Sequence, residues 1–436
     1  MTNFNISIFI HPPYQDCPIC KKTSVFGVLE IGGNAYTRKC MACKQTKEYH
    51  LPKLTKQIIY LDQFAISNMA KTLHPDTRDK VDPFWKDLFG KLDTLCKLQA
   101  IVCPKSNFHE EESRMTTDHF EKIRRINLQL SNNTSFINDE EIRRHQILKF
   151  SECWLNPEVS PETIQLESLA IFKEDPHGWQ SRIIKNVDFP IIPSWSERLR
   201  QIRKEAGKDY NEVVMKRRWE EQKGKSSKAF FRQVAEEEAS DFGRVILKLA
   251  KDQIGLMAAV ELGIIPAEKA DIWRTPSFLL VQSLEKLFTQ KEVPYNDLAK
   301  QVYGYLTSPL LAEIPFNKIG GALYAATARK HCAGKKDRPG DKKPSILADI
   351  SMISTLLPYC DAMMIDTECY LFLNEPDVQQ YLDYDTRLFC KKNRDEFMDY
   401  LNQIEINMTS EHRKVVTSVY GKDWERPYYN IFERTQ

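Results

Sequence analysis

The segment "KQIIYLDQFAISNMAK" (Lys56–Lys71) gives the first evidence for the fold class, because an apolar run within it ends abruptly on a carboxylate. Residues Ile58–Leu61 are apolar or aromatic and predict a short buried strand, whereas a helix-like pattern begins after Asp62. A helical pattern over 83–98 and a second apolar run over 99–104, "QAIVCP", follow. Strand, helix and strand joined by short links indicate a parallel sheet.

A similar alternation returns near the C-terminus. We expect a helix over 346–357 that is stopped by Pro358, and then a short buried strand, "AMMID", that ends on Asp366. The segment "TRLFC" (386–390) predicts one more strand, and "RDEFMDYLNQI" (394–404) predicts one more helix. The chain therefore has a second α/β segment far from the first.

The long middle region, from 107 to about 330, has almost wholly helical patterns with loops at prolines. We therefore predict an α/β fold in which one parallel-sheet domain is interrupted by a large helical insertion and preceded by a small β-rich segment. The predicted boundaries are 1–52 for the β-rich segment, 56–115 and 315–436 for the two halves of the sheet domain, and 116–314 for the insertion.

Composition narrows the class of protein. The chain has 436 residues, of which 42% are hydrophobic, so it is long enough for one large domain or several smaller ones. Its formal net charge of +2 does not by itself indicate a nucleic-acid binder. There is no run of about 18 apolar residues to span a membrane, and the N-terminal sequence lacks the features of a signal peptide. Four of the eleven cysteines form CxxC pairs and the others stand in apolar contexts, so we expect a reduced, cytoplasmic protein.

Two cysteine pairs in the β-rich segment predict a zinc site. Cys17-Pro-Ile-Cys20 and Cys40-Met-Ala-Cys43 are separated by 19 residues with β-like patterns. Each CxxC places two thiolates on one turn, and four thiolates give Zn²⁺ the tetrahedral sulfur ligands found in a zinc ribbon. Four protein ligands leave no position for a catalytic water, so we expect a structural site; a redox dithiol would need a thioredoxin-like setting. The excess of basic residues in this segment weakly favours nucleic acid, while a protein contact suits a ribbon equally.

Carboxylates follow the predicted strands of the sheet domain. Side chains at the carboxyl ends of parallel strands share one crevice, and Asp62 and Asp366 each stand at such an end. Asp349 lies near the start of the helix that precedes the strand of Asp366. Each also has a structural explanation, because Asp62 suits a helix cap and Asp349 suits the positive end of a helix dipole.

The segment "CPKSNFHEEESRM" (103–115) adds glutamates after the second strand. Ser106 is a candidate N-cap for a helix on which Glu112 shares the expected core-facing side and Glu111 lies about one residue off that line. Converging carboxylates repel one another unless cations lie between them, and such oxygen ligands select Mg²⁺ or Mn²⁺. These ions activate water and stabilise the leaving oxygen in phosphodiester hydrolysis.

The ordered elements "YLD", "S-x-x-H-x-x-E", "D", "PYCDAMMID" and "FCKKNRDEFMDYL" resemble the PIN-like nuclease superfamily, and more narrowly bacterial PIN-like proteins with an "LPYCD" element. The resemblance covers roughly 56–115 and 315–405 and leaves the ribbon and the helical middle unexplained. It implies a PIN-like fold and metal-dependent cleavage of single-stranded or structured RNA, less often DNA, often as a toxin or in phage defence. The catalytic and metal-binding residues that it implies are Asp62, Glu112, Asp349 and Asp366.

The sequence departs from this family pattern at one position and leaves another open. Gln63 follows the first aspartate, where many compact PIN domains have Thr or Ser, and Ser67 stands one turn further on. The run of glutamates leaves the choice between Glu111 and Glu112 open. Asp361 is a further candidate for the site, or else a turn residue that leads into the strand.

His109 and two basic stretches are further candidates. His109 lies in the expected crevice, where it either supports a ligand, binds phosphate or simply begins the helix. The loop over 335–343 is either a solvated linker or, since it precedes Asp349, a guide for a phosphate backbone. A basic stretch over 216–228 is either a solvated helical face or a phosphate-contacting surface. The candidate nucleic-acid-binding residues of the loop are Lys335, Lys336, Lys342 and Lys343.

These patterns together predict a metal-dependent endoribonuclease with a structural Zn²⁺ site, a catalytic Mg²⁺ or Mn²⁺ site and no membrane association. Its expected partner is RNA, with a second copy of the chain or a defence-system protein as further candidates. Two alternatives stay open: a non-catalytic module that binds nucleic acid or a protein through a vestigial site, and a DNA nuclease. The presence of all four acidic positions favours the enzyme.

Overall fold

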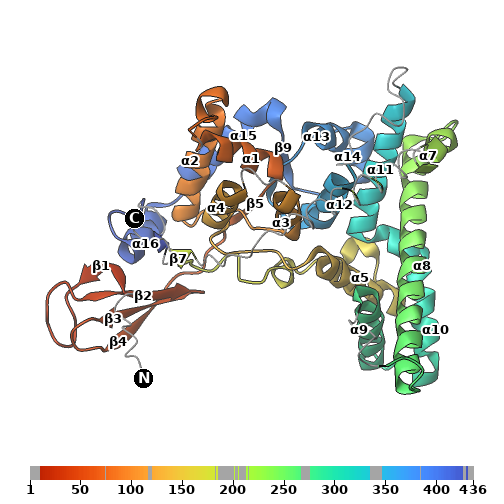
Figure 1. The fold of residues 1–436 in the computed structure, drawn as a ribbon, viewed down its shortest axis with the longest axis horizontal. Coiled ribbons are helices and arrows are strands. Elements are labelled where there is room, and N and C mark those ends of the chain that lie inside the picture. The colour runs from red at the N-terminus through yellow and green to blue at the C-terminus, as the bar shows by residue number, and fades with distance from the viewer. Residues whose placement is uncertain are drawn as a thin grey trace.

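The computed structural model is a mixed α/β protein in which a small antiparallel sheet and a large helical region lie at opposite ends of the molecule (Figure 1). A parallel sheet with its covering helices lies between them. The structure describes residues 10–73, 75–115, 120–181, 183–184, 201, 205, 213–214, 216–266, 275–333, 346–382, 384–425 and 429–430.

The N-terminal sheet agrees with the predicted β-rich segment. Its antiparallel strands pair in the order β1 (His11–Gln15), β2 (Phe26–Gly32), β3 (Ala35–Cys40) and β4 (Thr46–His50). β2 and β3 form a hairpin, and Gly33 in its turn has a φ of 55°. Glycine adopts this left-handed conformation without the steric cost that a side chain would bring, so the tight connection is possible here.

The central sheet is parallel and joins the two predicted α/β segments. Its strands pair in the order β6 (Ile101–Val102), β5 (Gln57–Leu61), β8 (Ala362–Met364) and β9 (Arg387–Phe389). β5 and β8 come from distant parts of the sequence and are hydrogen-bonded neighbours, with Leu61 opposite Met364. Asp62 and Asp366 therefore follow adjacent strands at the same edge of one sheet.

Alternate side chains of β5 enter two hydrophobic cores, one on each face of the central sheet. Ile59 and Leu61 belong to the first core. Ile58 and Tyr60 belong to the second. A strand that is covered on both faces needs a continuous apolar run, which explains the sequence pattern of this strand.

Helices cover both faces of the central sheet. Those of the first core are α1 (Gln63–Thr72), α2 (Phe84–Lys97), α4 (Phe120–Ser131) and α15 (Arg394–Ile406). Those of the second include α11 (Pro315–Ala333), α12 (Ile346–Leu356), α13 (Thr367–Leu373) and α14 (Pro376–Tyr381).

One helix of the predicted insertion, 116–314, packs against the central sheet. α4 lies within the predicted insertion, but its Ile123 and Ile126 complete the core beneath the central sheet. Because its apolar face is buried there, α4 belongs to the sheet layer. A separate core, which includes Leu284 and Tyr305, joins most of the remaining helices. The helices of the insertion are α5 (Asp139–Leu155), α7 (Lys216–Glu221), α8 (Ser227–Glu261), α9 (Pro276–Gln290) and α10 (Tyr295–Leu306).

The basic stretch of the insertion pairs with an acidic stretch of α8. Arg217 lies 3.5 Å from Glu237, and the Arg218 guanidinium forms an ion pair with Glu238. Arg218 is only 1% exposed and also lies over the ring of Tyr324. Both arginines thus pair with carboxylates of α8, Arg217 on the surface and Arg218 in the interior. For Arg218 this burial excludes the phosphate-contacting role considered for this stretch.

The N-terminal sheet is attached to α16 (Ser410–Tyr420) through a buried arginine. The guanidinium of Arg38 donates hydrogen bonds to two backbone oxygens of the N-terminal segment and to the Ser418 oxygen of α16, at 3.3 Å. Nearby, the Trp179 indole N–H donates to the Pro52 oxygen at 2.8 Å.

The other described elements are α3 (Asn107–Met115), the strand pair β7 (Ile183–Ile184) and β10 (Tyr429–Asn430), and 3₁₀ turns at Arg78–Lys80, Pro161–Thr163, Ser168–Ile171, Pro309–Glu313, Leu357–Tyr359 and Lys391–Asn393.

Candidate functional site

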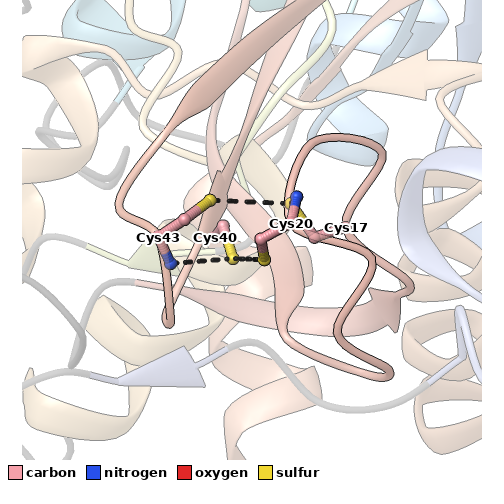
Figure 2. Close-up of side chains that lie close together, drawn as sticks. All are labelled: Cys17, Cys20, Cys40 and Cys43. Carbon is pink, nitrogen blue, oxygen red and sulfur yellow. Dashed lines mark hydrogen bonds between the residues drawn. The ribbon is translucent and has the colours of Figure 1, made fainter.

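Four cysteines of the N-terminal sheet form a compact sulfur cluster (Figure 2). Cys17 and Cys20 lie on the loop before β2, and Cys40 and Cys43 lie at the end of β3 and in the turn after it. The Sγ atoms of Cys17 and Cys43 are 3.7 Å apart, as are those of Cys20 and Cys40. Zinc–sulfur bonds of about 2.3 Å in a tetrahedron give sulfur–sulfur separations of about 3.8 Å. The cluster therefore has the ligands and the spacing that a zinc ion needs.

Two similar turns present these sulfurs. The backbone N–H of Cys20 donates to the sulfur of Cys17 at 3.5 Å, and that of Cys43 donates to the sulfur of Cys40 at 3.4 Å. Burial alone would raise the pKa of the Cys40 thiol, but backbone donors from Cys43 and Ala42 lower this pKa to about 6. The balance is opposite at Cys43, where a backbone donor lowers the thiol pKa but burial and the neighbouring sulfurs raise it to about 11. Metal binding requires deprotonated thiols, and a bound cation would offset this repulsion between the sulfurs.

Asp62 and Asp366 each follow a central strand and begin a helix. An Asp62 oxygen accepts the backbone N–H of Gln63 at 2.6 Å and caps α1. An Asp366 oxygen accepts the backbone N–H of Glu368 at 2.7 Å and caps α13. The helix cap considered for Asp62 is therefore present. Each carboxylate has two oxygens, so capping with one is compatible with ligation by the other.

The four predicted carboxylates lie close enough for their charges to interact. Asp62 is 8% exposed, and its burial, followed by the charges of Asp349 and Glu112, raises its pKa well above the usual value. Asp366 adds a smaller effect in the same direction. Asp349 comes from the first turn of α12 and Glu112 from α3. Four elements thus bring negative charge to one edge of the sheet, where a cation would relieve the repulsion.

These four carboxylates, called the acidic group below, are not as closely spaced as the cysteine sulfurs. Within the part of the chain that the structure describes, the four cysteines are the one set of His, Cys, Asp and Glu side chains whose ligand atoms all lie within 4.8 Å of one another. In addition to burial, the charges of Asp349, Glu112 and Asp366 still act on Asp62 and raise its pKa. We therefore treat them as a candidate site for a hydrated cation.

The structure separates the two candidate glutamates of α3. Glu112 is half-buried, and its charge adds to the effect of burial in raising the pKa of both Asp62 and Tyr60. Glu111 is exposed, and its charge acts on Glu140 at the start of α5. The charge of Glu112 therefore acts on the acidic group, whereas that of Glu111 acts on the start of α5.

His109 is a buried connection between α3 and the end of β5. Its Nε2 is 2.7 Å from the Leu61 carbonyl oxygen, and its Nδ1 accepts the Ser106 backbone N–H at 3.2 Å. A carbonyl only accepts and an N–H only donates, so these partners fix the tautomer with the proton on Nε2. Burial lowers the pKa of His109 to about 4, and the neutral ring stacks on Tyr60 with centroids 4.8 Å apart. Both nitrogens are occupied, so His109 positions the helix that carries Glu112.

Asp361 lies at the other end of the central sheet. Its carboxylate accepts the Ile58 backbone N–H at 2.6 Å, and its own backbone N–H donates to the Ile58 oxygen at 2.9 Å. Ile58 is near the start of β5, whereas Asp62 follows the end of that strand. The structure thus places Asp361 in the turn that leads into β8 and does not bring it to the acidic group.

Two neighbours of the acidic group were not singled out from the sequence. Cys369 is 1% exposed, and burial together with the charges of Asp349 and Asp366 raises its thiol pKa far above the usual value. Its position three residues after Asp366 on one helix is the spacing that signals a shared face. Glu368, in the same turn, accepts a hydrogen bond from the Lys330 ammonium at 2.9 Å.

The lysines predicted to bind nucleic acid, Lys335, Lys336, Lys342 and Lys343, lie outside the described residues. Lys391 and Lys392 follow β9 at the same edge as Asp366, because the Ile365 backbone N–H donates to the Phe389 oxygen at 2.9 Å. Both are exposed, and neither has a salt-bridge partner among the described residues. They supply positive charge at this edge that sequence reasoning did not single out.

A scan against protein-family models and searches of curated proteins and of solved structures gave no match to this chain. No helix among the described residues combines the length and the apolar character needed to cross a membrane. Function must therefore be argued from the site itself.

Proposed function

We propose that this protein is a PIN-like, metal-dependent nuclease that hydrolyses phosphodiester bonds in RNA, as a toxin or in phage defence. The observation that carries the proposal is the convergence of four acidic residues on one edge of the parallel sheet, around a buried aspartate. Their order along the chain is the order of the acidic motifs in the resemblance. The four residues are Asp62, Glu112, Asp349 and Asp366.

The donor set fits Mg²⁺ or Mn²⁺. Both ions prefer oxygen ligands, and the acidic group offers carboxylates from four elements. Held there, such an ion supplies Lewis-acid activation of water and charge stabilisation of the leaving oxygen. The chain's own part is to fix these ligands: helix caps hold Asp62 and Asp366, and His109 ties α3 to the end of β5.

The substrate backbone would cross the carboxyl edge of the sheet. The acidic group occupies the ends of the two central strands, and Lys391 and Lys392 lie at the end of the neighbouring strand β9. Neighbouring strands are about 4.8 Å apart, so the lysines are within reach of a phosphate next to the one held at the acidic group. The loop with Lys335, Lys336, Lys342 and Lys343 is proposed to guide the same backbone, since it precedes Asp349 in the sequence.

The cysteine cluster has a structural role in this proposal. Four thiolates complete the coordination of zinc and leave no position for water or substrate. The N-terminal sheet is joined to α16 by Arg38. Zinc therefore stabilises the N-terminal sheet. Catalysis takes place at the carboxyl edge of the central sheet that carries the acidic group, called the acidic edge below.

The proposal is tested by incubating the purified, zinc-loaded protein with labelled single-stranded RNA and single-stranded DNA, with and without Mn²⁺. Asp62→Asn removes the central carboxylate, and Asp361→Asn is the matched control at the other end of the same strands. We expect Mn²⁺-dependent RNA cleavage by the wild type and by Asp361→Asn, and loss of cleavage in Asp62→Asn.

The alternatives predict different results. Cleavage of DNA alone would make the protein a DNA nuclease, and binding of nucleic acid without cleavage would favour a vestigial site. RNA cleavage that survives both removal of Mn²⁺ and Asp62→Asn would contradict the proposed site.

A further inference from the structure

Gln63 lies between the two elements that carry Asp62 and Glu112. It is the first residue of α1, and its side chain is 8% exposed. Its backbone N–H donates to the Asp62 carboxylate, and its Nε2 donates to the Ser113 hydroxyl of α3 at 3.1 Å. Ser113 directly follows Glu112. The Gln63 amide therefore stands between the first turn of α1 and the glutamate-bearing part of α3.

The amide oxygen of Gln63 is buried and has no hydrogen-bond partner among the described residues. Buried side-chain oxygens are nearly always hydrogen-bonded, and an exception calls for a physical reason. With Nε2 on the Ser113 hydroxyl, the unsatisfied atom is Oε1, which can only accept a hydrogen bond. It belongs to a side chain that joins the residue after Asp62 to the residue after Glu112, the two proposed metal ligands.

A hydrated cation supplies the missing donor. Mg²⁺ is usually bound by one or two carboxylates and retains several of its waters. Each of these waters is a donor that needs an acceptor nearby. Among the described residues, the carboxylates do not form a set whose ligand atoms all lie within 4.8 Å of one another, so an ion between them would keep part of its hydration shell.

We infer that the Oε1 of Gln63 accepts a hydrogen bond from a water of the divalent cation held by Asp62 and Glu112. Gln63 is then a positioning residue for the hydrated ion, and the inference rests on the proposed metal site. It also accounts for glutamine directly after the aspartate, since its longer side chain reaches α3 and still leaves one amide atom for the ion's water.

A purely structural account competes with this inference. The amide of Gln63 joins α1 to α3, and that contact alone would make it part of the fold. The two accounts differ in what a substitution changes. Loss of a structural bond lowers the melting temperature, whereas loss of an acceptor for the ion's water lowers metal affinity in a protein that stays folded.

The experiment measures Mn²⁺ binding by isothermal titration calorimetry, with zinc-loaded protein and no nucleic acid. Gln63→Leu removes the acceptor, and Gln63→Glu keeps an acceptor at the same distance from the backbone. Gln253→Leu is the matched control, because Gln253 is a buried glutamine of α8 whose amide nitrogen also lacks a partner. Thermal unfolding without Mn²⁺ reports on the fold of each variant.

We expect Gln63→Leu to weaken Mn²⁺ binding by about tenfold or more, as is typical for residues that support a metal ligand shell. Gln63→Glu should bind Mn²⁺ at least as tightly as the wild type, and Gln253→Leu should match the wild type. If Gln63→Leu does not fold, Gln63→Met preserves the length and packing of the side chain, and the same prediction applies.

The outcomes separate the inference from the proposed function. Absence of Asp62-dependent Mn²⁺ binding in the wild type would overturn the proposed metal site itself. Wild-type binding that depends on Asp62 and is unchanged in Gln63→Leu would overturn the role of Gln63 and leave the metal site in place. A fall in melting temperature with full Mn²⁺ affinity would establish the structural account instead.

Discussion

The cysteine cluster and the acidic edge are both groups of four ligating side chains, yet they are assembled in different ways. The cysteines come in two adjacent pairs, and two short turns hold their sulfurs at the spacing that zinc needs. The carboxylates come from the ends of β5 and β8 and from two helices, and they are more widely spaced. A local motif can fix a metal site by itself, whereas a site built across a sheet depends on the packing of the whole domain.

The largest predicted effect follows from removal of zinc from the cysteine cluster. Cys40→Ser takes away one of four ligands, and structural zinc contributes about 10 kcal/mol or more of binding free energy to a domain of this kind. We expect bound zinc, measured by atomic emission, to fall from one ion per chain to nearly none. Limited proteolysis should then cut within residues 10–52. The buried Cys360 of the central core provides the control as Cys360→Ser, which should keep its zinc.

A second prediction concerns the acidic edge and has two parts of opposite sign. Asp62→Asn should lower Mn²⁺-dependent cleavage by about two to three orders of magnitude, the scale on which a single electrostatic contact to the reacting groups acts. The same substitution removes a buried charge that its neighbours repel, so the unfolding free energy without Mn²⁺ should rise. A cysteine of the cluster shows no such trade-off, because its removal only destabilises. Equal stability of Asp62→Asn and the wild type would mean that the carboxylates do not repel one another.

The sequence predicted the cysteine cluster and the strand that precedes Asp62. Ile58–Leu61 formed the expected strand because both of its faces are buried, and the CxxC spacing located the sulfur cluster. It could not show that α4 belongs to the sheet layer, since an amphipathic helix does not reveal its partner. It also could not show that Arg38 reaches Ser418, 380 residues away, or that His109 bonds to the Leu61 oxygen. Such contacts depend on tertiary packing, which no local pattern encodes.

A third prediction tests how the two regions are joined. Arg38→Met removes a buried guanidinium and leaves the backbone oxygens of Pro13, Phe26 and Ser418 without this donor. Unsatisfied buried acceptors of this kind destabilise a protein by about 3 kcal/mol in total. Urea unfolding should show this loss, while Lys53→Met on the exposed linker serves as the control. Unchanged Mn²⁺ affinity in Arg38→Met would confirm that the acidic edge is independent of the N-terminal sheet.

A fourth prediction concerns the substrate path beside the acidic edge. Replacing Lys391 and Lys392 together by Gln removes two positive charges from the end of β9. Each phosphate contact contributes about 0.7 to the slope of log affinity against log salt for a single strand, so the slope should fall by about 1.4. The measurement is RNA binding to the inactive Asp62→Asn protein at several salt concentrations. The matched control replaces Lys248 and Lys251, which are exposed on α8. An equal slope in both variants would exclude the path over β9.

The last prediction is a pH dependence of stability at the junction between the two regions. Lys56 is 1% exposed, and its ammonium donates to the Gln99 side chain at 3.0 Å and to the Gly178 oxygen at 2.7 Å. Burial lowers its pKa from 10.5 to about 7 in the folded protein. Between these values the unfolded chain binds more protons than the folded one, so stability rises with pH from about 7 to about 10.

This contribution has a maximum slope of about 1.4 kcal/mol per pH unit. Lys56→Met removes the titrating group, so the difference in unfolding free energy between the wild type and this variant should shift in favour of the wild type as pH rises from 7 to 9. Lys53→Met, three residues earlier and exposed, should run parallel to the wild type. Parallel curves for Lys56→Met and Lys53→Met would mean that Lys56 stays charged in the fold. The contribution of Asp62 to stability changes with pH in the opposite direction. Its carboxyl pKa is raised in the folded protein, so its contribution falls as pH rises. The effects of Lys56 and Asp62 can therefore be distinguished by their signs in one pH series.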